Sequence, residues 1–180
     1  MKTGFGAFIE QAKTNFKATE GLLIALTYVF ALTFLCFPGL ADDSHFNFLS
    51  GNKEEDSWYN LISVLIFNAC DTAGRYIGAS PCSDLRRKTV LFMAAFRTIF
   101  LLFFLLIAFE VAPAGLFQSD WFKILNYALF SYTNGYTSTL CAIKAPQTVS
   151  GEQKGQVGAF VGVTISLGIL LGSTLALGMG

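Results

Sequence analysis

Long apolar stretches alternate with short polar connections along this chain of 180 residues. A helix needs about 20 predominantly apolar residues to cross the hydrocarbon core of a bilayer. Stretches of that length occupy residues 21–40, 58–80, 89–109, 122–143 and 156–178, and the first is expected to stop at Phe37-Pro38-Gly39. The pattern therefore predicts an all-α membrane protein whose transmembrane domain, residues 21–180, contains five spanning helices.

The first 20 residues differ, because polar and charged positions separate the apolar ones. The apolar residues recur with a weak helical spacing that is typical of an amphipathic helix on a membrane surface. They are Phe5, Phe8, Ile9, Ala12 and Phe16. We expect residues 1–20 to form a short cytoplasmic amphipathic segment.

Composition supports a lipid environment for the predicted helices. Charged residues make up 13% of the chain and hydrophobic residues 53%, whereas soluble domains carry roughly a quarter charged residues. The net charge is zero, so the chain has no basic field that favours nucleic acid. We therefore predict the lipid bilayer, and no nucleic acid, as a partner of the chain.

Lysine and arginine are distributed unevenly between the connections. Those before span one, between spans two and three, and between spans four and five are basic, whereas the others are mostly acidic. The basic set is Lys13, Lys17, Arg86, Arg87, Lys88, Lys144 and Lys154; the acidic set is Asp42, Asp43, Glu54, Glu55, Asp56, Glu110 and Asp120. Because cytoplasmic loops are enriched in basic residues, we expect a cytoplasmic amino terminus and an outside carboxyl terminus. That alternation requires an odd number of spans.

The second predicted span carries charge inside the membrane. Asn68, Asp71 and Arg75 are spaced three and four residues apart, so they share one helix face. Each isolated charge there costs about 2.5–3.5 kcal/mol on insertion scales, so this face is expected to meet a cavity or a protein interface. One interpretation is that these groups line a solute pathway. The other is that Asp71 and Arg75 neutralise each other and fix the helix against a neighbour.

The fourth and fifth spans hold further features of interest. Polar residues fill positions 131–139 of the fourth span, and Asn134 with Gly135 allows a local break that exposes backbone to a cavity. Ordinary hydrogen bonds between helices explain the same block equally well. In the fifth span, two pairs of glycines four residues apart predict close packing against other helices. The pairs are Gly158 with Gly162 and Gly168 with Gly172.

The turn at residues 83–88 is acidic and then basic. At minimum it fixes the topology, and it resembles the cytoplasmic turn with which major-facilitator transporters hold their inward gate closed. Asp84, Arg86 and Arg87 are therefore candidate gate residues. Glu152 is a further candidate, because it either caps the last helix or pairs with one of these arginines.

Catalytic and metal-binding chemistry is not predicted. Cys36, Cys70, Cys82 and Cys141 have no metal-ligand spacing, and His45 stands alone in a polar loop. The sequence contains no Ser/His/Asp arrangement and no phosphate-binding loop. We therefore expect neither an enzyme nor a bound metal or cofactor.

The charged span also carries a recognisable motif. Phe67-Asn68, Asp71 and Gly74-Arg75 resemble the F-N-x-x-D-x-x-G-R signature in the eighth helix of equilibrative nucleoside transporters. Three weaker similarities support this resemblance. Residues 134–136 are similar to a motif of that family's tenth helix, and residues 37–38 are similar to the end of its seventh helix. The glycine-rich span after residue 152 is similar to its last helix.

This resemblance implies helices seven to eleven of an eleven-helix transporter, with a fold similar to the carboxy-terminal bundle of the major-facilitator superfamily. It implies transport of nucleosides, in some members of nucleobases, by alternating access, with an amino-terminal six-helix half as the partner. The implied substrate-binding residues are Asp71, Arg75, Asn68, Val64, Phe37 and Pro38. Asn134, Tyr136 and Ser131 are the candidates for lining the pathway.

Two alternatives remain open at this point. One is a proton-coupled transporter in which Asp71 carries the proton. The other is a truncated membrane protein that does not transport and assembles with a partner half. We expect a multi-pass protein of the plasma membrane, with an organelle membrane as the alternative.

Overall fold

The structure is a computed structural model that describes residues 4–37, 40, 55–109 and 115–179. Throughout these residues the regular structure is helical, which confirms the predicted all-α class. The elements are α1 (Gly4–Cys36), α2 (Glu55–Gly78), the 3-10 helix η3 (Pro81–Ser83), α3 (Arg87–Phe96), α4 (Thr98–Ala108), α5 (Asp120–Gln147) and α6 (Gln153–Leu177).

Three helical stretches are long and apolar enough to cross a membrane. They are α1, the run Arg87–Ala108 that comprises α3 and α4, and α6. At 24 and 28 residues, α2 and α5 have sufficient length, but they carry the polar blocks of the sequence and are less apolar. The assignment as an integral membrane protein therefore rests on α1, the α3–α4 run and α6.

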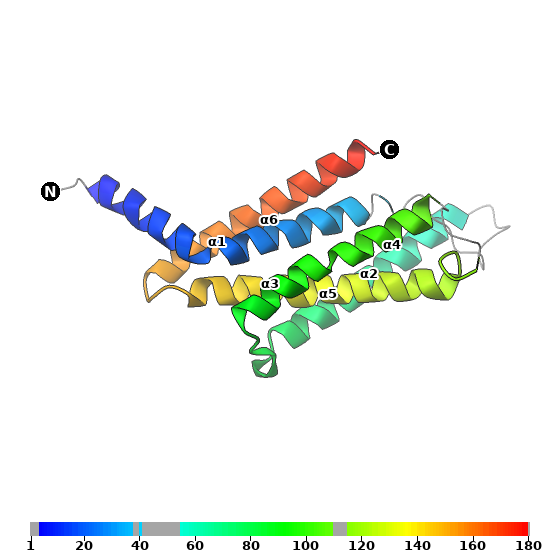
Figure 1. Ribbon diagram of the computed structural model, residues 1–180, viewed down its shortest axis with the longest axis horizontal. Helices are drawn as coiled ribbons and strands as arrows, with labels where there is room; N and C mark the ends of the chain where they lie inside the picture. The colour runs from blue at the N-terminus through cyan, green and yellow to red at the C-terminus, as the bar shows by residue number, and fades with distance from the viewer. Residues whose placement is uncertain (1–3, 38–39, 41–54, 110–114, 180) are drawn as a thin grey trace.

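The helices follow the predicted spans, with two differences. The third predicted span is divided at Arg97, which ends α3 and precedes α4. The amino-terminal segment is not a separate short helix, because residues 4–20 continue directly into the first predicted span as one 33-residue helix. The beginning of α1 projects from one end of the bundle (Figure 1).

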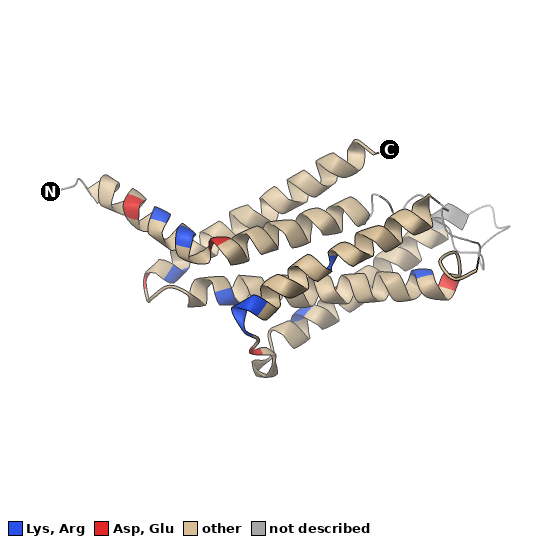
Figure 2. Ribbon diagram, viewed as in Figure 1, with Lys and Arg blue, Asp and Glu red and all other residues tan. Residues whose placement is uncertain are grey.

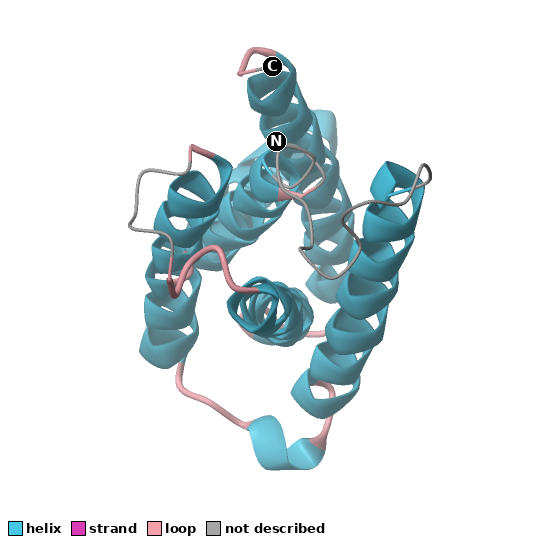
Figure 3. Ribbon diagram, turned by 90° about the vertical axis from the view of Figure 1, so that its right-hand side faces the viewer, coloured by secondary structure: helices cyan, strands magenta, loops and turns pink. Residues whose placement is uncertain are grey.

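The helices are arranged around α5, which packs against α1, α2, α3, α4 and α6 (Figures 1 and 3). The most extensive contacts join α2 to α5 and α1 to α6. In Figure 2, most of the described lysines and arginines lie toward the end of the bundle that holds the start of α3 and the α5–α6 connection. This end corresponds to the basic connections identified in the sequence.

Glycines bring α2 and α5 into backbone contact. A Cβ atom on Gly74 would lie 2.2 Å from the Tyr132 carbonyl oxygen, and one on Gly135 would lie 2.0 Å from the Asp71 carbonyl oxygen. Because real Cβ atoms do not approach so closely, both positions require glycine. The contact places the polar block of α5 directly beside Asp71.

The glycine pairs of α6 have different environments. Gly168 and Gly172 face α1, where an added Cβ would lie 2.6 Å from the Thr27 carbonyl oxygen and 2.3 Å from that of Ala31. Gly158 and Gly162 are exposed, and no atom of the described residues lies within 4 Å of an added Cβ at either position. The predicted close packing therefore holds for the second pair and not for the first.

Two apolar clusters form the core. One joins α1, α3, α5 and α6, with Val29, Val90 and Val157 fully buried. The other is rich in aromatic residues and joins α1, α2, α4 and α5. Along α1, the α3–α4 run and α5, buried polar side chains lie between the members of these two clusters.

Candidate functional site

The polar layer between the clusters is centred on Arg97, at the break between α3 and α4. The Arg97 side chain is 1% exposed, and its guanidinium carbon lies 4.7 Å from the centre of the Phe130 ring. Its Nη1 donates to the Phe130 carbonyl oxygen at 2.8 Å and to Thr133 Oγ1 at 2.6 Å. Among the described residues, no carboxylate lies within ion-pair distance of Arg97.

A chain of hydrogen bonds leads from Arg97 to Asp71. Arg97 Nη2 donates to Thr33 Oγ1 at 2.9 Å. Thr33 Oγ1 lies 2.8 Å from Asn134 Oδ1, and Asn134 Nδ2 donates to Asp71 Oδ1 at 2.7 Å. Residues from α1, α2, α5 and the α3–α4 junction thus meet in one buried network.

Arg75 completes the network at its other end. Its Nε donates to Asp71 Oδ2 at 2.6 Å, one helical turn along α2. The Arg75 side chain is 45% exposed, whereas that of Asp71 is 12% exposed. A largely buried carboxylate is therefore bound on one oxygen by a buried amide and on the other by a guanidinium that reaches the surface of the described bundle.

The other predicted substrate-binding residues are separate from this network. Val64 and Asn68 are exposed on α2, and the Asn68 side-chain amide donates to the Val64 carbonyl oxygen at 2.9 Å. The Phe37 ring stacks on Phe67, with ring centres 4.7 Å apart. Pro38 lies outside the described residues.

The predicted pathway-lining residues of α5 have different surroundings. Asn134 is buried at the α2–α5 contact. Ser131 is also buried, and its hydroxyl donates to the Tyr127 carbonyl oxygen of its own helix. Tyr136 is half-buried and stacks with Tyr132. The local break that Asn134 and Gly135 would allow does not occur, because α5 is continuous there and Gly135 serves the contact with α2.

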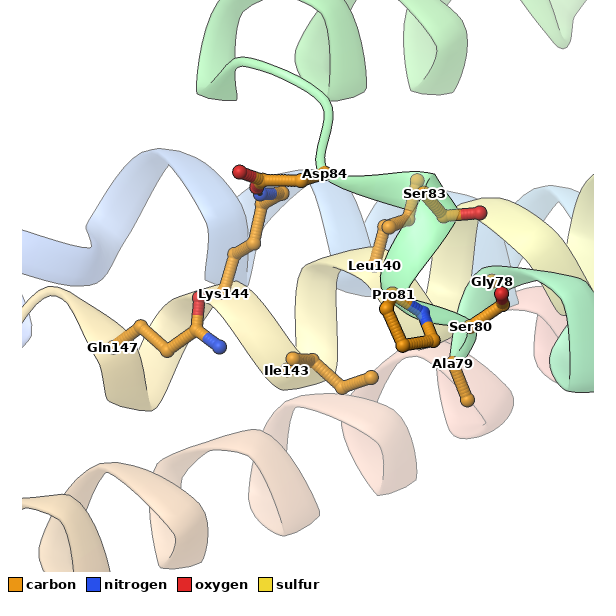
Figure 4. Close-up of a pocket in the computed structure, with 10 residues that line it drawn as sticks. All are labelled: Gly78, Ala79, Ser80, Pro81, Ser83, Asp84, Leu140, Ile143, Lys144 and Gln147. Atoms are coloured by element: carbon orange, nitrogen blue, oxygen red, sulfur yellow. The ribbon is translucent and has the colours of Figure 1, made fainter.

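At the basic end, Asp84 pairs with Lys144 of α5. Lys144 Nζ donates to Asp84 Oδ1 at 2.8 Å, and this hydrogen bond holds the pKa of the Asp84 carboxyl below its usual value. The two side chains lie at the rim of a cavity of about 220 Å³ lined by the end of α2, η3 and α5 (Figure 4).

The remaining gate candidates do not join this pair. Arg87 Nη1 donates to the Ala18 carbonyl oxygen of α1 at 3.1 Å. Arg86 is exposed just before α3. Glu152 occupies the position before α6, where its side chain makes no capping hydrogen bond.

Comparison with known sequences decides the family. The profile of a family described as nucleoside transporters matches residues 5–179, almost the whole chain. The chain belongs to the nucleoside transporter family. This confirms the resemblance drawn from the motif at residues 67–75, and it places the chain in a family of transporters.

Individual relatives of the chain support this family assignment. Equilibrative nucleoside transporter 3 of Rattus norvegicus is 30% identical over 166 residues, 89% of this chain and 35% of its own length. Adenosine transporter 1 of Crithidia fasciculata is 24% identical over 168 residues, 89% of this chain and 31% of its own. Nucleoside transporter 1.2 of Leishmania donovani is 24% identical over 174 residues, which are 91% of this chain and 32% of the relative's length. The chain thus spans about a third of the length of these relatives.

Two central residues of the polar network, Arg97 and Thr33, were not predicted from the sequence. Arg97 is the one charged residue between Lys88 and Glu110 in an otherwise apolar run, and such an intramembrane arginine is by itself a reason to expect a functional site. Thr33 gave no comparable signal, because a single threonine in an apolar helix commonly bonds to its own backbone.

Proposed function

We propose that this chain forms part of a transporter that moves nucleosides across a membrane, and that Asp71 and Arg75 contact the nucleoside. The observation that carries the proposal is the pairing of a buried carboxylate with a guanidinium 45% exposed on the same helix turn. Asp71 accepts from Arg75 Nε, which leaves the Nη donors of Arg75 for hydroxyl or ring oxygens. The names of the relatives support the nucleoside as the substrate class.

The exposed face of α2 supports a solute pathway beside these residues. Val64, Asn68 and Arg75 are exposed, and their spacing of four and seven residues places them on one helix face. The described helices leave this face uncovered, as expected for a surface that meets a solute cavity or further helices of a longer transporter. Intramembrane charge is costly to expose to lipid, which favours the cavity.

We propose further that α2 and α5 cross the membrane together with α1, the α3–α4 run and α6. Their polar residues Asp71 and Asn134 are buried against each other, so these groups do not meet lipid despite the lower hydropathy of the two helices. The basic connections then lie in the cytoplasm, as does the amino terminus. Because the relatives are about three times longer, we propose alternating access in which this bundle rocks against a second one around a site at mid-membrane depth.

An uptake experiment tests this function. The chain is expressed alone, and also in a chimera in which it replaces the matching third of the Rattus norvegicus relative, in cells that lack nucleoside uptake. We expect the chimera to take up radiolabelled uridine or adenosine. We expect Arg75→Gln to lower that uptake about tenfold or more, as loss of a charged hydrogen bond to the solute implies.

Lys88→Gln provides the matched control, because it removes one positive charge from an exposed position at the start of α3. Equal uptake by the Arg75 and Lys88 variants at equal surface level would contradict the role of Arg75. Uptake by the chain alone would show that no partner half is needed. Flux that depends on pH, and loses this dependence in Asp71→Asn, would favour the proton-coupled alternative.

A further inference from the structure

Two arginines share one carboxylate in the polar network. Arg75 binds Asp71 directly, whereas Arg97 reaches it through Thr33 and Asn134. We propose that Arg97 is a positioning residue that holds the Asp71 carboxylate in place through this relay, so that Arg75 is able to leave Asp71 and bind the nucleoside. The part of the proposal that concerns the nucleoside rests on the proposed function.

The relay has a direction. A guanidinium can only donate hydrogen bonds, and an ionised carboxylate can only accept them. Arg97 therefore donates to Thr33, and Asp71 accepts from the Asn134 amide nitrogen, which turns the Asn134 amide oxygen toward Thr33. The Thr33 hydroxyl hydrogen then points to Asn134, and every donor in the chain points from the cation toward the anion.

Both ends are needed to keep this direction. Thr33 Oγ1 also lies 2.7 Å from the Val29 carbonyl oxygen of its own helix, the usual acceptor for a helical threonine. Without the Asp71 charge, Thr33 is the one described residue whose side chain still binds the Asn134 amide, and that single bond holds the amide orientation less firmly. Without Arg97, Thr33 Oγ1 no longer accepts the hydrogen bond from the guanidinium. We then expect the Thr33 hydroxyl to donate to the Val29 carbonyl oxygen instead. Hydrogen bonds in such a chain polarise and strengthen one another, so the two ends should be energetically coupled.

Charge explains why the second arginine matters. If Arg75 turned toward a solute in a network without Arg97, the Asp71 carboxylate would be left buried without a nearby cation, which is costly. Arg97 is buried, is fixed by the Phe130 carbonyl and Thr133, and cannot follow Arg75 to the surface. It therefore remains as the compensating charge while Arg75, whose side chain is 45% exposed, moves.

A double-mutant cycle in the full 180-residue chain tests the relay without any transport assay. The unfolding equilibrium constants of wild type, Arg97→Gln, Asp71→Asn and the double variant are measured in mixed detergent micelles. The relay predicts non-additivity of about threefold or more in these constants, the range found for groups in one hydrogen-bond network. It also predicts that the non-additivity disappears in a Thr33→Val background and persists in Thr33→Ser, which keeps the hydroxyl.

The Thr33 backgrounds separate the relay from simple attraction across space. Coulombic coupling between Arg97 and Asp71 does not need a hydroxyl, so coupling that survives Thr33→Val overturns the relay. If Arg97→Gln does not fold, the same cycle is run with Thr33→Val in its place, and additivity with Asp71→Asn overturns the proposal. Thr19→Val is the control, because Thr19 is equally buried in α1 but donates to carbonyls of its own helix.

Uptake by the chimera tests the link to the nucleoside. We expect Thr33→Val to raise the KM for the nucleoside about threefold or more with an unchanged maximal rate at equal surface level, whereas Thr33→Ser and Thr19→Val keep the parent KM. An unchanged KM in Thr33→Val overturns this part. If the parent chimera transports nothing, the proposed function fails while the double-mutant cycle still decides the relay.

Discussion

Replacing Gly135 with alanine should separate α2 from α5 and disturb the Asp71 network. The added Cβ would lie 2.0 Å from the Asp71 carbonyl oxygen, about 1.4 Å short of the 3.4 Å at which ordinary contact begins. A separation of that size would lengthen the 2.7 Å bond from Asn134 to Asp71 beyond hydrogen-bonding distance. Overpacking of this kind costs about 1–3 kcal/mol, and the gain in helix propensity from alanine offsets up to about 1 kcal/mol of it.

We therefore expect Gly135→Ala to be destabilised by up to about 3 kcal/mol in detergent unfolding and to lose nucleoside uptake in the chimera. Gly162→Ala is the matched control, because it makes the same change inside α6 with no neighbour within 4 Å. That variant should be neutral or more stable by up to about 1 kcal/mol. Equal stability and uptake in the two variants would refute the backbone contact between α2 and α5.

Two further predictions concern the connections and the buried thiols. The exposed thiol of Cys82 should react with a membrane-impermeant maleimide after permeabilisation of cells but not before, whereas the buried Cys36 and Cys141 stay unlabelled; labelling of Cys82 in intact cells would contradict the proposed orientation. Because Lys144 lowers the pKa of Asp84, their pair contributes its full stability above about pH 4 and loses it as the pH falls through the lowered pKa. Thermal unfolding measured between about pH 6 and pH 3 should show this acid sensitivity in wild type and less of it in Lys144→Gln, and identical profiles would rule the pair out.

The sequence was sufficient to predict the helices and the position of the charged pair. Apolar length alone locates a helix, because a spanning or buried helix must satisfy its backbone internally. The spacing of Asp71 and Arg75 fixes their relation, since residues four apart on a helix are neighbours in any fold. The ion pair between them therefore follows from α2 alone, as the second interpretation of that face expected.

Contacts between helices were harder to predict, because they depend on how each helix is rotated about its axis. Gly158 with Gly162 and Gly168 with Gly172 have the same spacing, yet the rotation of α6 turns the second pair to α1 and leaves the first exposed. In the sequence of α5 alone, Gly135 suggested a helix break. Its role in the close contact with α2 is visible only when the backbone of Asp71 lies beside it.

The position of Arg97 is a similar case. Its charge is evident in the sequence, but its partners Thr33, Thr133 and the Phe130 carbonyl lie 64, 36 and 33 residues away along the chain. No local spacing rule joins residues so distant. The network that surrounds Asp71 therefore needed the packed bundle, whereas the Asp71–Arg75 pair did not.

We propose that the Asp71 carboxylate serves nucleoside transport. The most direct measurement is the uptake of radiolabelled uridine and adenosine by Asp71→Ala in the chimera, with surface level determined for each variant. We expect Asp71→Ala to abolish uptake and Lys88→Gln to retain it. Uptake by Asp71→Ala equal to that of the parent, at equal surface level, would contradict a role of this carboxylate in transport.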